Sequence, residues 1–274
     1  MRLKSLISSL AIASCLPFAA FAANSSAPVT DLESNHTCIP GQAETSNNYN
    51  ATKWYRSSAE RNAQYNQVFN IGLEKIATAV KQDKLKKHSW GVIMDIDETV
   101  LDNSQYEKGN VLSCSSYSPQ SNYAFMEQKT SIATPGAKNF TCSVQKMGGR
   151  VVFVTNRDGH FDDKIQAATV DNLKSAGLCY DNVVFANGSK DSDKTPRFNA
   201  VIAGDYSNIV AIDKIKPIKV VAYFGDNIQD FPNIKQSDAI KQDPNDISYY
   251  SKFGQEYFSL PNPTYGSWEH NSFK

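Results

Sequence analysis

The chain has 274 residues, of which 41% are hydrophobic and 20% are charged. These fractions are ordinary for a globular protein, and the length suits one large domain or one domain with an insertion. The formal net charge is zero, which excludes an electrostatic argument for binding a nucleic-acid polymer.

The first 22 residues have the pattern of a signal peptide. The basic residues Arg2 and Lys4 precede a mostly apolar stretch, residues 6–19, that is too short for a transmembrane span. The segment Ala20-Phe21-Ala22 fits the small-x-small pattern of a cleavage site. We therefore expect the mature chain to begin near residue 23 and to be periplasmic or secreted.

A second interpretation of the N-terminus is a lipoprotein that is cleaved before Cys15 and anchored in the outer membrane. The residues after Cys15 are apolar, whereas a tethered lipoprotein usually begins with a polar linker, so simple export is favoured. Residues 23–50 are polar and predict a flexible segment. Residues 51–274 then form the predicted folded domain.

Four cysteines remain after removal of the signal peptide, namely Cys38, Cys114, Cys142 and Cys179. In an oxidising compartment they permit two disulfides in any of three pairings. Unpaired buried thiols are the alternative interpretation. The spacing matches no zinc-binding pattern.

The first part of the predicted domain contains a helix, a strand and a long connection. Apolar residues at helical spacing predict one amphipathic helix over residues 53–82. The apolar run Trp90–Met94 predicts a buried parallel strand that leads directly into Asp95 and Asp97. Residues 104–134 are irregular, and an insertion of this length above a strand's carboxyl end predicts a substrate-reading cap.

Helices and strands alternate in the rest of the chain, which predicts a parallel sheet in a three-layer α/β domain. The further strands are expected at 151–154, 182–186 and 219–224. One helix is expected to end near Met147 and another to cover residues 162–175.

Polar clusters follow three of the four predicted strands. They are Asp95 with Asp97, Thr155-Asn156-Arg157, and Asp226 with Asp230. Because the carboxyl ends of parallel strands meet at one edge of a sheet, we expect these clusters to converge. Carboxylates with Mg²⁺, a hydroxyl group and a lysine such as Lys194 suit a phosphoryl group better than a neutral substrate.

Other hydrolytic and nucleotide-binding sites are not supported by the sequence. No Gly-x-x-x-x-Gly-Lys loop is present, so a P-loop nucleotidase is not indicated. No Gly-x-Ser-x-Gly elbow is present, so a serine hydrolase is not indicated either.

These clusters resemble, in order, the four motifs of the haloacid dehalogenase (HAD) phosphohydrolase superfamily. The motifs are Asp95-Ile96-Asp97-Glu98-Thr99, Thr155-Asn156-Arg157, Lys194 and Gly225-Asp226-Asn227-x-x-Asp230. Further segments resemble one branch, the class C bacterial nonspecific acid phosphatases, with class B as a near relative. These segments are Trp54, Ser58-Ala59-Glu60, Leu101-Asp102-Asn103-Ser104 and Asn262-Pro263-Thr264-Tyr265-Gly266-Ser267-Trp268-Glu269.

The resemblance implies an α/β fold with a HAD-like parallel-sheet core, an inserted cap and an N-terminal helix. It also implies a Mg²⁺-dependent acid phosphatase that hydrolyses phosphomonoesters such as 5′-nucleotides and aromatic phosphates. Asp95 would form an aspartyl-phosphate, and Asp97 would protonate the leaving oxygen and later activate water. Thr155 and Lys194 would hold the phosphate.

One Mg²⁺ would be held by the Asp95 carboxylate, the Asp97 backbone carbonyl and Asp226. Asp230, Asn156 and Arg157 would be supporting residues, and Arg197 is a further candidate for such a role. Glu98 and Asp102 are expected not to be ligands.

The sequence departs from the family pattern in two places. The family commonly has a pair of tryptophans in the cap, whereas Tyr123 and Phe125 lie in that region here. Lys190 competes with Lys194 for the third motif. We prefer Lys194, because it begins a segment with Pro196 near the first turn of a predicted helix.

Two other functions remain open at this point. An alcohol in place of water would make the same intermediate a phosphotransferase. A non-catalytic surface or storage protein on the same scaffold is the third interpretation. The sequence predicts a small-molecule substrate and no transmembrane span in the mature chain.

Overall fold

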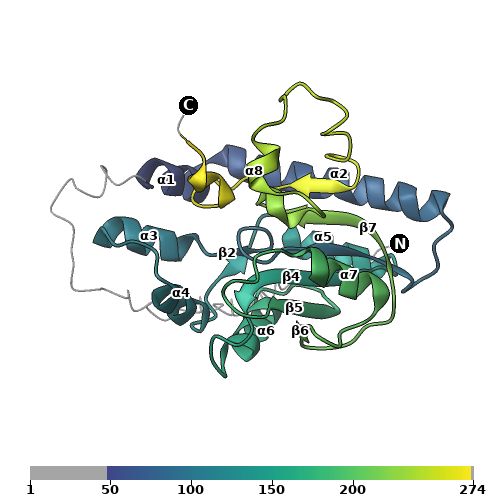
Figure 1. The fold of residues 1–274 in the computed structure, drawn as a ribbon, viewed down its shortest axis with the longest axis horizontal. Helices are drawn as coiled ribbons and strands as arrows, with labels where there is room; N and C mark the ends of the chain where they lie inside the picture. Colours follow the sequence, from purple (N-terminus) through teal and green to yellow (C-terminus); the bar gives the residue numbers. More distant parts are fainter. Residues whose placement is uncertain (1–47, 273–274) are drawn as a thin grey trace, which may run out of the picture. The chain divides into compact units, whose positions relative to one another are not determined.

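A six-stranded sheet forms the centre of the fold in the computed structural model, which describes residues 48–272. Figure 1 shows the sheet, whose strand order is β6-β5-β4-β1-β7-β8. All neighbouring strands are parallel except β5 and β6. The strands are β1 (Trp90–Met94), β4 (Arg150–Asp158), β5 (Asn182–Ala186), β6 (Val210–Ala211), β7 (Lys219–Gly225) and β8 (Tyr257–Ser259).

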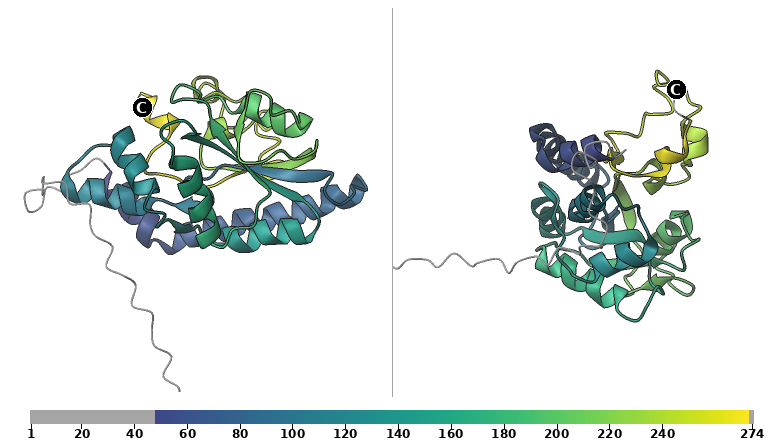
Figure 2. Two further views of the ribbon diagram at one scale, coloured as in Figure 1. Left: turned by 90° about the horizontal axis from the view of Figure 1, so that it is seen from below. Right: turned by 90° about the vertical axis from the view of Figure 1, so that its left-hand side faces the viewer.

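Helices cover both faces of this sheet, as the two views of Figure 2 show. The side chains of β1 alternate between two hydrophobic clusters, with Val92 and Met94 in one and Ile93 in the other. The first cluster includes residues of α2 (Ala59–Gln82), α5 (Ala137–Lys146) and α6 (Ile165–Ser175), and the second includes residues of α7 (Thr195–Ala203). The predicted three-layer α/β fold is therefore confirmed.

The predicted helix over residues 53–82 is wrong in one respect, because two helices occupy this region. Helix α1 (Tyr49–Ser57) ends before Ser58, whose φ of −82° and ψ of 140° are extended. The Ser58 side chain accepts a hydrogen bond from the backbone N–H of Arg61 at 3.1 Å. Ser58 therefore caps α2, and the chain changes direction there because the cap residue leaves helical geometry.

The insertion over residues 104–134 is more regular than its composition indicates. It contains α3 (Ser104–Ser113) and α4 (Pro119–Met126). Two short strands, β2 (Leu101–Asp102) and β3 (Ile132–Ala133), pair antiparallel and bring its ends together. The irregular structure predicted for this segment is therefore wrong, since helices of 8 and 10 residues are too short to give a clear period in sequence.

The other predicted strands and helices are present, and several of them begin or end at other residues than predicted. Strands β1 and β5 have the predicted bounds, and β4 continues through the second motif to Asp158. Strands β6 and β8 were not predicted, because segments of two and three residues show no alternation. The short helices that complete the fold are η2 (Ile228–Asp230), α8 (Gln236–Ala239) and η3 (Ser267–His270).

One disulfide joins Cys142 in α5 to Cys179 after α6. Of the three possible pairings, the structure therefore contains the one in which these two residues are partners. Cys38 lies outside the described residues, as do the predicted signal peptide and most of the predicted flexible segment. Within residues 48–272, no helix is both long and apolar enough to span a membrane.

Replacing Cys142 and Cys179 together with serine is expected to destabilise the fold. The bond closes a sequence separation of 37 residues, and loop-closure entropy predicts a loss of about 4 kcal/mol in the free energy of unfolding. Urea unfolding of the oxidised wild type and the double variant measures this difference. Equal midpoints and equal slopes for the two proteins would contradict the prediction.

Candidate active site

The predicted polar clusters converge at the carboxyl ends of the central strands. The chain connects β1 to β4 on one side and reaches β7 on the other side of β1. The strand order therefore reverses at β1, and such a switch point leaves a crevice between the neighbouring connections. Asp95 follows β1 and Asp226 follows β7, so both carboxylates lie at this crevice.

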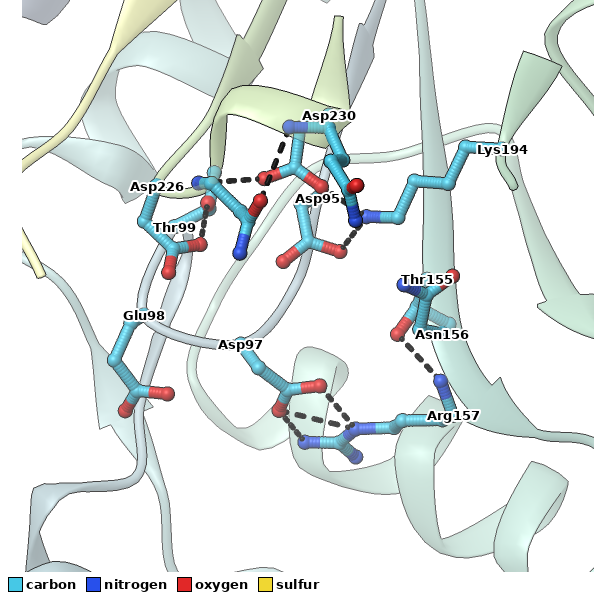
Figure 3. A network of polar contacts seen from close by, with 12 residues as sticks. Asp95, Asp97, Glu98, Thr99, Thr155, Asn156, Arg157, Lys194, Asp226 and Asp230 are labelled. Carbon is cyan, nitrogen blue, oxygen red and sulfur yellow. Dashed lines mark hydrogen bonds and ion pairs between the residues drawn. The ribbon is translucent and has the colours of Figure 1, made fainter. Parts of the chain in front are cut away.

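Lys194 pairs with two of the carboxylates at this edge. Its ammonium group donates to Oδ1 of Asp95 and lies 2.7 Å from Oδ1 of Asp230 (Figure 3). All three residues are buried. Lys190, the competing lysine, is exposed, so the structure favours the choice of Lys194.

The electrostatics of this cluster follow from burial. Burial, partly opposed by the charge of Lys194, raises the pKa of Asp95 to about 7. Burial also opposes the charge on Lys194, but Asp230 and Asp95 outweigh it and raise the pKa of the ammonium group. The cluster therefore contains a buried ammonium group beside a carboxylate, and any further positive charge would stabilise the ionised form of that carboxylate.

Asp95, Asp226 and Asp230 can hold a metal ion, because one carboxylate oxygen from each lies within 4.8 Å of the others. Burial, together with the charges of Asp230 and Asp95, raises the pKa of Asp226 well above its ordinary value. A bound cation would relieve this repulsion, and carboxylate oxygens are ligands that Mg²⁺ prefers. These carboxylates therefore fit the predicted Mg²⁺ ion. Asp230 lies close enough to the other two to be a ligand, whereas only a supporting role was predicted for it.

Two residues from distant segments orient Asp226. The hydroxyl of Thr99 donates to Oδ1 of Asp226 at 3.0 Å, and the side-chain amide of Asn262 donates to Oδ2 at 2.9 Å. Asn262 belongs to the C-terminal segment that resembled the family without an assigned role. The loop after β1 and the C-terminal segment therefore fix the same carboxylate.

The turn after β7 brings Asp230 back against the end of the strand. Oδ2 of Asp230 accepts a hydrogen bond from the backbone N–H of Asn227 at 2.9 Å. A Cβ atom at Gly225 would lie 2.2 Å from Cβ of Asp230. Glycine is therefore required at position 225, because any larger residue would displace Asp230 from Lys194.

Asp97 faces away from the other carboxylates and pairs with Arg157. Arg157 donates to both carboxylate oxygens, with its terminal nitrogen 2.7 Å from Oδ1 (Figure 3). The side-chain amide of Asn103 donates to the same oxygen at 2.6 Å. Burial opposes ionisation of Asp97, but Arg157 and Asn103 outweigh it and lower the pKa of this carboxyl.

The other residues of the second motif have mixed positions. The hydroxyl of Thr155 is buried and accepts a hydrogen bond from the N–H of Arg157 at 3.1 Å. Arg197 donates to the carbonyl of Thr155 and, at 2.7 Å, to the side chain of Asn156. Arg197 thus contacts the second motif, and both its supporting role and the phosphate contact of Thr155 stay predictions.

Glu98 and Asp102 each contact other groups of the protein, and the prediction that neither is a ligand stays a prediction. The carboxylate of Glu98 accepts hydrogen bonds from the hydroxyl of Tyr265 and, at 2.7 Å, from the backbone N–H of Asn103. Asp102 pairs with Arg61 of α2 at 2.8 Å. Both carboxylates therefore connect the loop after β1 to other parts of the fold.

We refer to Asp95, Lys194, Asp226 and Asp230 as the catalytic cluster. A cavity of about 1060 Å³ opens from this cluster toward the insertion and the C-terminal segment. Tyr106, Tyr117 and Tyr123 line it, as the predicted cap role requires. Phe125 is buried and packs on Tyr106, with ring centroids 5.7 Å apart. Of these four aromatic residues of the insertion, Phe125 thus lies in its core and does not line the cavity.

Four residues at the site, Asn103, Asn262, Tyr265 and Trp268, have no role predicted from the sequence. The first three contact catalytic or neighbouring carboxylates, and Trp268 lines the cavity. All four lie in segments that carried the family resemblance. The family resemblance of these segments is the sequence signal that could have indicated a role. Spacing could not, because the contact partners lie elsewhere in the sequence.

A sequence family and solved structures resemble this chain. Residues 20–268 match the sequence family described as HAD superfamily, subfamily IIIB (acid phosphatase). The structure of a class C acid phosphatase from Bacillus anthracis with tungstate bound has 23% sequence identity and a TM-score of 0.68, covering 84% of this chain and 89% of that chain.

A further structure of the class C acid phosphatase from Bacillus anthracis has 25% sequence identity and a TM-score of 0.65, covering 80% of this chain and 85% of that chain. The family match extends over most of the sequence, including all four motifs that converge at the end of β1. The chain therefore belongs to the HAD superfamily, subfamily IIIB, and is an acid phosphatase, that is, a phosphomonoesterase.

Proposed function

We propose that this acid phosphatase acts through a covalent aspartyl-phosphate on Asp95, with Mg²⁺ as its metal. 5′-Nucleotides and aromatic phosphates are the proposed substrates. The observation that carries the proposal is the packing of Asp95 against Lys194 beside Asp226 and Asp230. A nucleophilic carboxylate, a fixed ammonium group and an acidic metal site are the parts that phosphoryl transfer requires.

In the first step, Lys194 contacts the phosphate oxygens and an oxygen of Asp95 attacks phosphorus. The new oxygen–phosphorus bond forms as the bond from phosphorus to the leaving oxygen breaks. Asp97 donates a proton to that leaving oxygen, which departs as an alcohol. Arg157 and Asn103 hold the Asp97 carboxyl in a fixed orientation.

In the second step, Asp97 accepts a proton from a water molecule that attacks the phosphorus atom. The bond between Asp95 and phosphorus breaks, which releases inorganic phosphate and restores the Asp95 carboxylate, while Asp97 is again protonated. Asp97 therefore acts first as an acid and then as a base, and a residue with a single fixed position can serve both steps.

Asp95, Asp226 and the backbone carbonyl of Asp97 would hold the Mg²⁺ ion, with Asp230 in support. The ion would supply positive charge that offsets the oxygens of the phosphoryl group. Thr99 and Asn262 keep Asp226 oriented toward this position.

Replacing Asp95 with Asn is expected to lower kcat for p-nitrophenyl phosphate by at least about a thousandfold, because the amide is not a nucleophile. EDTA is expected to abolish wild-type activity, and Mg²⁺ to restore it. Assays at about pH 5–6, where a carboxylic acid can act as general acid, measure both effects. Full activity in Asp95→Asn or in EDTA would exclude the proposed mechanism.

Lys194 and Lys190 form a matched pair for a second test. Lys194→Met is expected to lower kcat/KM by about a hundredfold or more, because a fixed cation at the phosphate is lost. Lys190→Met is expected to keep wild-type kcat/KM, since its side chain is exposed. Thermal unfolding checks that both variants fold. Loss of activity in Lys190→Met alone would reverse the assignment.

Phosphotransfer is the second candidate function for the same intermediate. The cavity of about 1060 Å³ has room for an acceptor alcohol beside the catalytic cluster. With glycerol added to p-nitrophenyl phosphate, a transferase releases more p-nitrophenol than inorganic phosphate and forms glycerol phosphate. Equal release of the two products at every glycerol concentration would exclude it. Membership of the acid phosphatases sets aside the non-catalytic scaffold.

We also propose that the protein is exported. The signal-peptide pattern in residues 1–22 and the Cys142–Cys179 disulfide support this proposal, because disulfides persist in oxidising compartments. Fractionation of the producing cells tests it. Recovery of the full-length chain in the cytosol would contradict export, and labelling by a lipid precursor would indicate the form anchored through Cys15.

A further inference from the structure

The cavity that contains the catalytic cluster also reaches parts of the protein that take no part in phosphoryl transfer. Asn48 at the start of α1, Glu107 in α3 and Glu269 in η3 line the same cavity. These residues lie beside the space that the leaving group of a bound phosphomonoester must occupy, because Lys194 and the carboxylates take the phosphate end. Their chemistry therefore bears on which leaving groups bind.

The charges along the cavity are unequally distributed. Its two basic residues, Arg157 and Lys194, both pair with carboxylates of the catalytic cluster. Glu107 accepts a hydrogen bond from the side-chain amide of Asn48 at 3.2 Å, and Glu269 accepts one from the N–H of Gly266 at 3.2 Å. Neither glutamate forms an ion pair with another residue in the range 48–272.

Aromatic rings provide a second, independent feature of the same region. Tyr117 is 61% exposed and Trp268 is 43% exposed, although both are large rings that line the cavity. The face of an aromatic ring carries partial negative charge and attracts cations, most strongly when the ring is that of Trp. Positively charged groups are therefore attracted both by the carboxylates that lack a cationic partner and by the exposed aromatic rings.

We propose that Glu107, assisted by Glu269, selects phosphomonoesters whose leaving group carries a protonated amine. The proposal rests on the phosphatase function described above and specifies its substrate class. Glu107 contacts the ammonium group of the leaving group, and the rings of Tyr117 and Trp268 contact its carbon framework. An anionic leaving group is disfavoured by the same two carboxylates.

The pH at which this selection operates follows from the surroundings of Glu107. Burial raises the pKa of its carboxyl to about 7, with the Asn48 hydrogen bond opposing the shift and the charge of Glu269 adding to it. Glu269 of η3 and Tyr117 of the α3–α4 connection are the titratable groups that face it. Since Glu107 is ionised above this pKa, the preference for a cation rises between about pH 6 and about pH 8.

The test compares three aryl phosphates that differ in the charge of one substituent. They are 4-(aminomethyl)phenyl phosphate, which is cationic at the ring substituent, neutral 4-ethylphenyl phosphate, and anionic 4-(carboxymethyl)phenyl phosphate. The proteins are the wild type, Glu107→Gln and Glu269→Gln, each with its metal bound. Glutamine at position 107 keeps an acceptor for Asn48 but removes the charge. Glu74→Gln, on the exposed face of α2, is the matched control.

In the wild type at about pH 8, the ratio of kcat/KM for the cationic to the neutral substrate is expected to be high. In Glu107→Gln this ratio falls about tenfold and no longer rises with pH, because an attraction between opposite charges has been lost. In the same variant, the ratio of kcat/KM for the anionic to the neutral substrate increases. A variant with a damaged fold would not show this increase. Glu74→Gln keeps the wild-type ratios, and high salt weakens the effect in the wild type.

Unchanged ratios in both Glu107→Gln and Glu269→Gln would overturn the inference while leaving the phosphatase function intact. Failure of the metal-loaded wild type to hydrolyse any of the three substrates would instead overturn the proposed function on which the inference rests. Hydrolysis of the neutral substrate by the wild type therefore separates the two cases.

Discussion

The active site depends on the repulsion among three carboxylates at one edge of the sheet, those of the buried Asp95 and Asp230 and of the partly buried Asp226. Lys194 offsets part of this repulsion by contacting Asp95 and Asp230. Ionised carboxylates at this density are unfavourable away from water, and burial raises the pKa of Asp95 and Asp226 accordingly. The same arrangement attracts a cation and, in the proposed function, places the nucleophile Asp95 beside the ammonium group of Lys194.

Segments that are far apart in the sequence keep these carboxylates in place. Thr99 and Asn262 hold Asp226, whereas Arg157 and Asn103 hold Asp97 on the opposite side of the crevice. The two aspartates of the first motif therefore differ in environment although one residue separates them. Asp95 points to the carboxylates that can hold a metal ion, and Asp97 points to an arginine.

The insertion and the C-terminal segment complete the cavity around this edge. Tyr117 from the insertion and Trp268 from the C-terminal segment both line it, together with Glu107 and Glu269. In the proposed function, the parallel sheet supplies the end that binds the phosphate, and the added segments supply the surface that contacts the leaving group. Chemistry and substrate choice are thus assigned to different parts of the chain, as in many α/β enzymes.

The sequence by itself determined the central strands, the order of the motifs and the candidates for the cluster at the strand ends, Asp95, Lys194, Asp226 and Asp230. It did so because apolar runs predict buried strands, and strand ends in a parallel sheet must meet at one edge. Short elements carry little periodicity, so several of them could not be predicted from the sequence. They are the break at Ser58, the two helices within residues 104–134 and the strands β6 and β8.

Only the tertiary structure decided the partners of the catalytic residues. Pairing of Asp97 with Arg157, of Asp226 with Asn262 and of Cys142 with Cys179 joins segments separated by 60, 36 and 37 positions. Sequence spacing does not specify such contacts, because they depend on how loops are packed above the sheet. Local patterns place the motif residues at the end of the sheet, whereas the orientation of their side chains depends on long-range packing.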